Sequence, residues 1–159
     1  MKNFKILFLF MLVLLCLSTT AFANKPSITS DNNYLDINTG RYMLDGHVRI
    51  DTGSRIITAD AAQVSITSLE VWGQGHITVT QDDIVFTGDK VYVNGNNKEA
   101  SIDGSVDLER KDLSITANSV KFNWDTKIAE FYDNVNANIN GKQISTDHLR
   151  YNITDNQVL

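Results

Sequence analysis

The sequence predicts an all-β protein, an elongated antiparallel structure of jelly-roll type built from 29-residue repeats. One short phrase occurs four times at a constant spacing, as "ITADAAQV" (57–64), "FTGDKVYV" (86–93), "ITANSVKF" (115–122) and "ISTDHLRY" (144–151). Between these phrases, apolar and polar residues alternate with the period of two that is typical of a strand with one buried face. Beyond the N-terminal segment, no window has a convincing helical period.

Residues 1–23 are expected to be a secretory signal peptide and not part of the fold. "MKNFK" is basic, residues 6–17 are apolar, and Ala21 and Ala23 form a cleavage motif with small residues. The apolar run is shorter than the roughly 20 residues of a membrane-spanning helix. An uncleaved membrane anchor is the alternative, because no charged residue follows Lys5 before Ala23. Cys16 lies inside this segment and lacks the preceding small residue that lipidation requires.

Residues 24–159 are expected to form one domain without disulfide bonds. This segment is long enough for a substantial core. It contains no cysteine, so packing and backbone hydrogen bonds must hold an exported domain together. Of the 14 basic residues, Lys2 and Lys5 lie in the signal, which leaves 12 against 19 acidic residues and a net charge of −7. Such a chain is a poor general binder of nucleic acid, so no nucleic-acid partner is expected.

Each repeat contains two β segments joined by short polar turns. In the first segment, Ala100, Ile102, Val106 and Leu108 share one face and alternate with polar residues. The turns include "TGS" (52–54), "QDD" (81–83), "RKD" (110–112) and "NGK" (140–142), and turns this short connect antiparallel neighbours. This pattern predicts roughly nine strands of about 10–12 residues, longer than the usual length of about 5–6.

The repeated phrase lies where the alternation slips by one residue. Ala59 and Ala62, for example, are both apolar but three positions apart, with Asp60 between them, so strict alternation would place them on opposite faces of the strand. One extra residue in a strand, with Asp or Asn at the slip, indicates a β-bulge or corner. The glycines of the other segment permit a bend or a close backbone approach. A sheet that bends in both segments of every repeat folds over on itself and encloses a continuous apolar interior.

No constellation of residues predicts catalysis, a cofactor or a metal site. Asp60, Asp89, Asn118 and Asp147 recur at one backbone position, as a bend requires, whereas an active site brings unlike groups together once. The three histidines are expected at the surface, and none has the spacing of a zinc site. Nucleophile-elbow, Walker and Rossmann motifs are absent from the sequence. We therefore expect a protein that is not an enzyme.

The apolar interior is the candidate binding site, because a slightly open β sandwich also suits alkyl chains. Each buried methylene contributes about 0.8 kcal/mol, so part of one acyl chain is enough for useful affinity. The candidate lipid-binding residues all have the apolar parity of their repeats. They are Ile57, Val64, Val79, Phe86, Val93, Leu108, Ile115 and Phe122.

The chain resembles the LptA/OstA-like proteins, the periplasmic components of lipopolysaccharide transport. The resemblance begins in "KPSITSDNNYLDINTGRYMLDGHVRI" (25–50), continues into "ITADAAQV" and covers essentially all of residues 24–159. It implies a twisted β-jellyroll that carries lipopolysaccharide, with the lipid A chains inside, from the inner to the outer membrane. It also implies stacking end to end, both with itself and with related β-jellyroll domains of membrane components. The chain departs from the pattern at Asp133, where the repeat glycine is replaced.

Both ends of the repeat array predict unpaired strand edges. The segment 28–37 is a partial copy of 57–66, and Val158 occupies the column of Val71. Exposed strand edges invite the addition of a further strand. The predicted edge or oligomer contacts lie in the two terminal half-repeats. They are Ile28, Leu35, Ile37, Tyr151, Ile153 and Val158.

The residues and the resemblance together predict a periplasmic bridge that carries lipopolysaccharide and is secreted through a cleaved signal peptide. One alternative is an inner-membrane-anchored relative from the same pathway. Another, from a different class, is a structural β-repeat filament that binds no lipid. A carbohydrate-active β-repeat enzyme would need a nonrepeating pair of acids, which the repeats do not provide.

Overall fold

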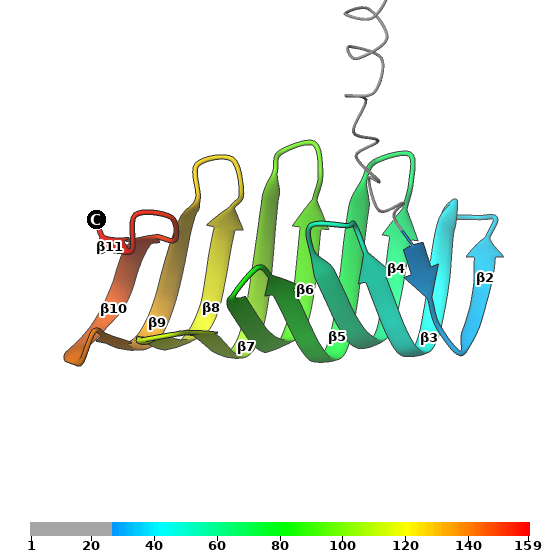
Figure 1. Ribbon diagram of the computed structural model, residues 1–159. Helices are drawn as coiled ribbons and strands as arrows, with labels where there is room; N and C mark the ends of the chain where they lie inside the picture. The colour runs from blue at the N-terminus through cyan, green and yellow to red at the C-terminus, as the bar shows by residue number, and fades with distance from the viewer. Residues whose placement is uncertain (1–26) are drawn as a thin grey trace, which may run out of the picture.

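The computed structural model describes residues 27–159, which form one 11-stranded antiparallel sheet (Figure 1). The predicted all-β class is therefore confirmed. The predicted signal peptide lies outside the described residues. The strands are β1 Ser27–Thr29, β2 Asn32–Asp36, β3 Arg41–Asp51, β4 Ile56–Ser65, β5 Glu70–Gln81, β6 Ile84–Asn94, β7 Glu99–Arg110, β8 Leu113–Asn123, β9 Ile128–Ile139, β10 Lys142–Asn152 and β11 Gln157–Val158.

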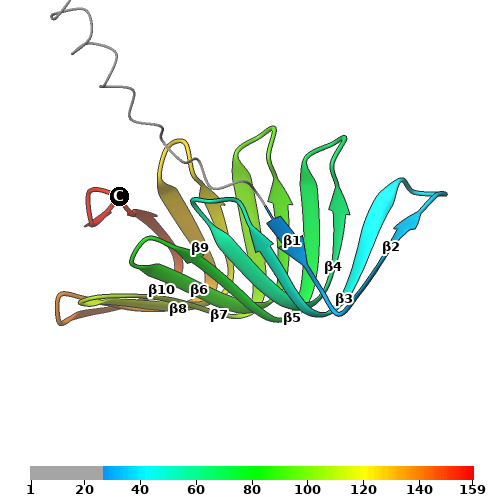
Figure 2. The same ribbon diagram turned by 45° about the vertical axis from the view of Figure 1, so that its right-hand side comes forward.

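The strands follow one another along the sheet in chain order. The long strands β3 to β10 contain 10 residues at the shortest and 12 residues at the longest, and each pairs with its neighbours in sequence. The first half-repeat is divided at Asp31 into β1 and β2, which both pair with β3, so eight long strands replace the nine expected. The strands at the two ends of the sheet run in clearly different directions in Figure 2, as an accumulated twist requires.

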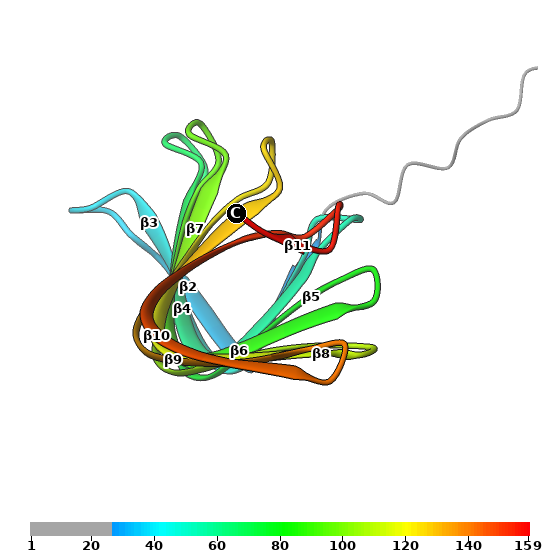
Figure 3. The ribbon, with the colours of Figure 1, turned by 90° about the vertical axis from the view of Figure 1, so that its left-hand side faces the viewer.

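A corner in every long strand folds the sheet into two walls (Figure 3). Wall A carries the turns around 53, 82, 111 and 141 and consists of the strand halves next to them. Wall B carries the turns around 38, 67, 96, 126 and 155 and consists of the other halves. Described strands that are not hydrogen-bonded to each other have no Cα atoms within 8 Å. Backbone hydrogen bonds therefore hold each wall together, while side chains fill the space between the walls.

The extra residue at each corner lies in the odd-numbered strand, which corrects the sequence interpretation. Between paired neighbours of β3 and β4, Gly46 and His47 stand opposite the single residue Asp60. Between β5 and β6, Gly75 and His76 stand in the same way opposite the single residue Asp89. The parity slip is visible in the even-numbered strand because its inward residues, such as Ala59 and Ala62, are three positions apart.

Three glycines are required at these corners by their conformation and by close packing. Gly46, Gly75 and Gly104 have φ values of 75°, 75° and 81°, in the left-handed region. A Cβ atom on Gly75 or Gly104 would collide with the side chain of Asp60 or Asp89. In the fourth corner, Asp133 occupies the position of the glycine and has a φ of 61°. The left-handed conformation is therefore kept, although L-residues rarely adopt it.

The hydrophobic core runs along the whole length between the walls. Its largest fully buried side chains include Tyr151, Phe131, Ile77, Leu108 and Ile115. No fully buried polar or charged residue interrupts this core within the described chain. The period-two alternation of each strand half places one apolar face inward on both walls, which is how a single sheet encloses an interior.

Candidate functional site

The structure places all eight predicted interior residues on the inward faces of the two walls. Ile57, Val64, Val79, Phe86, Leu108 and Ile115 are buried in the core. Val93 and Phe122 are partly buried and pack against it. The corner geometry explains this convergence, because each register shift returns the apolar residues of both strand halves to the same side.

Five of these residues meet in one apolar crevice between the walls. The crevice is lined by Ile57, Val79, Phe86, Val93 and Phe122, and Ala100, Ile102 and Val120 complete its apolar lining. Phe86 of wall A and Phe122 of wall B approach with ring centroids 5.9 Å apart. Val64, Leu108 and Ile115 belong to the core outside this lining. The crevice is thus a place where side chains from the two walls meet.

The crevice is nearly filled in this conformation. Its volume is about 30 Å³, which is the share of one water molecule in the liquid. A hydrocarbon chain can therefore enter only if the walls separate or the lining side chains rearrange. Because no backbone hydrogen bond joins strands of opposite walls in the described chain, separation breaks side-chain contacts and leaves the sheet intact.

Arg55, Gln81 and Trp124 complete the lining of the crevice at the ends of the strands, next to the turns of the two walls. The guanidinium carbon of Arg55 lies 4.7 Å from the centroid of the Trp124 ring, and the two residues belong to turns of opposite walls. Nε and Nη2 of Arg55 donate hydrogen bonds of 2.9 and 2.8 Å to the side-chain oxygen of Gln81. Burial lowers the pKa of Arg55, and the charge of Asp82 acts in the opposite direction. Arg55 is thus a partly buried cation beside an apolar space.

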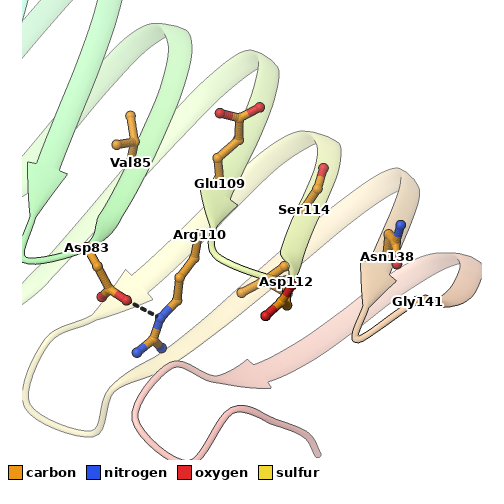
Figure 4. Close-up of a pocket in the computed structure, with 9 residues that line it drawn as sticks. Asp83, Val85, Glu109, Arg110, Asp112, Ser114, Asn138 and Gly141 are labelled. Carbon is orange, nitrogen blue, oxygen red and sulfur yellow. Dashed lines mark hydrogen bonds and ion pairs between the residues drawn. The ribbon is translucent and has the colours of Figure 1, made fainter.

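A second contact joins the walls nearer the C-terminal end. Arg110, the last residue of β7 in wall A, donates a 2.8 Å hydrogen bond from Nη1 to the backbone oxygen of Ile153 in wall B. Its Nε also lies 2.7 Å from an oxygen of Asp83, as Figure 4 shows. The shallow hollow around this pair has a volume of about 580 Å³ and is lined by Glu109, Asp112, Ser114 and Asn138 among others. These are surface polar groups that surround an ion pair.

The corners carry a row of exposed polar pairs. Nδ1 of His47 lies 2.6 Å from the carboxylate of Asp31, and Nδ1 of His76 lies 2.8 Å from that of Asp60. Hydrogen bonds to these carboxylates raise the pKa of both histidines. Their side chains are 90% and 91% exposed, in agreement with the surface location expected for them. Within residues 27–159, no group of three or more His, Cys, Asp or Glu side chains is arranged to hold a metal ion.

The predicted edge contacts divide into two groups. Ile28, Leu35, Ile37 and Val158 are exposed, whereas Tyr151 and Ile153 are buried. β11 covers the end of β10 by pairing Val158 with Tyr151, and the Tyr151 hydroxyl donates to the side chain of Asn156. The prediction that Tyr151 and Ile153 lie at an open edge is therefore wrong. The first half of β10, residues 142–146, is instead the part that has no second neighbour among the described residues.

Sequence reasoning missed Arg55, Gln81 and Trp124 as part of the crevice lining, although one signal was present. The repeat column of Arg55 contains Ile84, Leu113 and Lys142, of which Ile84 and Leu113 are buried and Lys142 is exposed. Arg55 is thus a cation in a column whose two middle members are apolar and buried, which marks a local departure from the repeat. Its contact with Trp124 spans more than two repeats, so the period alone does not reveal the partner.

Comparison with known proteins identifies relatives of this fold. A family model described as OstA-like protein matches residues 23–158. Among solved structures, the chain is similar to LptH of Pseudomonas aeruginosa, described as the LptA-homologous periplasmic component of the conserved lipopolysaccharide transport device, with a TM-score of 0.57. The identity is 12%, and the match covers 62% of this chain and 76% of LptH, so the likeness concerns the fold. No curated protein matches the chain in sequence. Residues 27–159 contain no helix that is long and apolar enough to cross a membrane.

Proposed function

The chain belongs to the OstA-like protein family, and on this premise we propose that it is a non-enzymatic periplasmic carrier and bridge for lipopolysaccharide. The observation that carries the proposal is the apolar interior between two walls of one sheet, which are continuous at the corners and meet elsewhere only through contacts of side chains. Acyl chains would lie between the walls, and the polar part of the lipid would remain outside. The likeness to LptH, a periplasmic component of a lipopolysaccharide transport device, supports the same role.

Opening the interior is energetically feasible for a ligand of this kind. The contacts between the walls are dispersion contacts, the hydrogen bond from Arg110 to the Ile153 carbonyl and the stacking of Arg55 on Trp124. Each methylene that enters contributes about 0.8 kcal/mol of burial, so several methylenes would offset the lost contacts. The interior residues named above remain in apolar surroundings throughout.

Site-specific photo-crosslinking tests the location of the lipid. A crosslinking residue at Phe86 or Ile115 is expected to capture lipopolysaccharide. Crosslinkers at Asp107 and Thr116, which lie on the outer face of the same wall, serve as controls and should capture none. Each variant is first checked for the β-sheet circular dichroism of the parent protein. Equal labelling at inward and outward positions would contradict the interior site, and a folded protein that captures no lipid would favour a structural β filament.

We further propose that subunits stack end to end, with the interior continuous across the joint. Leu35 pairs with Tyr42, and Tyr42 pairs with Val64, so the inward row of wall B continues to the N-terminal edge and is exposed there. The free edges of β1 and β2 could receive residues 142–146 of another copy by strand addition, or a related domain of a membrane component. Such a contact is heterologous, so its repetition gives an open chain.

Light scattering across a concentration series tests this stacking. The protein is expected to elongate as its concentration rises, and Leu35→Lys should reduce elongation by placing a charge in the continuous apolar row. Tyr34→Lys is the matched control, because the neighbouring side chain lies on the opposite face of β2. A species that stays monomeric at every accessible concentration would exclude self-stacking, while leaving binding to membrane components to be measured separately.

A further inference from the structure

Arg55 differs from the rest of the crevice lining in carrying a charge. The other described lining residues are apolar or, like Gln81 and Trp124, neutral. No carboxylate of the described chain lies within ion-pairing distance of its guanidinium group, whose hydrogen bonds from Nε and Nη2 go to the neutral amide of Gln81. A partly buried guanidinium with a neutral acceptor still has strong affinity for an anion, because charge-assisted hydrogen bonds are roughly twice as strong as neutral ones.

A second arrangement of the same three residue types lies elsewhere on the molecule. Arg41 stacks over Trp72 at 4.0 Å and donates a 3.1 Å hydrogen bond to Gln63. Trp72 pairs with Gln63 and with Tyr92 on the outer face of wall B, so this group covers no part of the crevice. Arg41 also helps to lower the pKa of Glu70, whose stronger causes are hydrogen bonds from Ser68 and Tyr92. The two groups share their chemistry and differ in what lies beneath them.

We propose that Arg55 and Trp124 form a gate over the crevice, and that the anionic headgroup of a lipid opens it by binding the Arg55 guanidinium. A phosphate accepts the planar donor pair that Gln81 now receives and does so with a full charge. Once the guanidinium turns to the headgroup, Trp124 loses its stacking partner and the path to Phe86 and Phe122 is uncovered. The acyl chain then enters beside the same residue that holds the head. The inference rests on the proposed function, since it assumes that the crevice accepts acyl chains.

The positions of Arg55 and Trp124 make the proposed gate selective for anionic amphiphiles. Arg55 and Trp124 come from opposite walls, so their separation is also the first step in moving the walls apart. A neutral amphiphile offers at most an uncharged acceptor of the kind that Gln81 already provides, so it gains little from displacing the stacking and the two hydrogen bonds. The gate therefore selects amphiphiles by the charge of the head, while the crevice selects them by the apolar chain.

Binding of two matched amphiphiles tests the proposal. Dodecyl phosphate and its uncharged dimethyl ester, both below their micellar concentrations, are titrated into the Trp72→Phe variant, in which Trp124 is the remaining tryptophan. The phosphate is expected to bind at least about tenfold more tightly than the ester and to shift the Trp124 emission. In Arg55→Gln this preference should disappear while the ester still binds, which shows that the variant is folded. Arg41→Gln removes the same charge from the outer face and should keep the preference.

The outcomes separate the two proposals. If both amphiphiles bind the Trp72→Phe protein equally, or if Arg55→Gln keeps the tenfold preference, the gate is overturned and the carrier function stands. If neither amphiphile binds, both the gate and the acyl-chain site are overturned. Loss of the preference in Arg41→Gln as well as in Arg55→Gln would also overturn the gate, because it would show an effect of net charge alone.

Discussion

Apolar side chains are exposed at the N-terminal end of the sheet and buried at its C-terminal end. At the N-terminal end, Tyr34, Leu35 and Ile37 are 64%, 48% and 86% exposed on or beside β2. At the C-terminal end, Tyr151 and Ile153 are buried under β11 and the turn before it, and Arg110 ties that turn to wall A. The same repeat therefore leaves its interior open at one end and closes it at the other. This difference gives the molecule a polarity that a simple count of repeats would not predict.

The largest expected effect contrasts aromatic residues at the two ends. Tyr151→Ala removes a fully buried ring and should lower the free energy of unfolding by about 3–5 kcal/mol. Tyr34→Ala removes an exposed ring and should change it by less than about 0.5 kcal/mol. Urea denaturation measures both. Tyr151→Phe, which keeps the ring, separates the loss of packing from the loss of the hydroxyl group, and similar costs at Tyr151 and Tyr34 would refute the closed end.

The second effect compares a corner glycine, which the first three repeats have and the last one replaces by Asp133, with a glycine in a turn. Gly104→Ala places a Cβ atom against Asp89 at φ 81° and should cost about 2 kcal/mol. Gly141→Ala has nearly the same φ, 82°, but its Cβ atom would meet nothing within 4 Å. It should therefore cost about 1 kcal/mol, the lower end of the range for a left-handed conformation without a steric clash. Equal shifts of the urea midpoint would show that the conformation alone, and not the packing on Asp89, requires glycine.

A smaller effect is expected from opening the closed end. Arg110→Gln removes the hydrogen bond to the Ile153 carbonyl and the ion pair with Asp83, and should cost about 1 kcal/mol. Hydrogen exchange should accelerate in residues 153–158 and remain unchanged in β3. Arg49→Gln is the control, because Arg49 makes an exposed ion pair with Asp51 at 3.4 Å and joins no turns. Unchanged exchange in Arg110→Gln would mean that β11 holds the end by itself.

The smallest effect distinguishes the corners near the N-terminus from the later ones. His47 and His76 pair with carboxylates, whereas Ser105 and Asn134 hold the equivalent positions. Because the pKa of each histidine is raised in the folded protein, the stabilisation is full below the ordinary value of 6.5 and is lost as the pH rises through the raised value. The double variant His47→Gln/His76→Gln should therefore flatten the decline in melting temperature as the pH rises above 6.5. A histidine pKa at or below 6.5 by NMR titration would contradict the pairing.

The repeat made most of the fold and of the interior predictable from sequence. The period of two within a strand and the constant spacing of the repeats are local signals, and they were enough to place Ile57, Phe86 and Ile115 on one inward face. The bulge was assigned to the wrong strand because Leu44 and Val48 are four positions apart. This even spacing conceals the extra residue between them.

Contacts between the walls could not be predicted in the same way. They depend on how far the twist of the sheet displaces one wall along the other. The alignment of the repeats gives no information on this displacement. Arg55 meets Trp124, and Arg110 meets Ile153, because of this displacement. The closed end was missed for a different reason: the repeat column of Val64, Val93 and Phe122 places Tyr151 inward, but no column shows that residues 157–158 turn back as β11 and pair with it.

The pairing of every long strand with its neighbours in sequence fixes how the molecule can change in length. One repeat adds two strands, which extends the sheet by about 9.5 Å at the usual strand spacing. The same two strands rotate one end relative to the other by about 40–50°. Duplication or loss of a whole repeat therefore changes reach and orientation together, in fixed steps. A domain of this kind can therefore span a given distance only at those steps, and each step presents its terminal strand at a different angle.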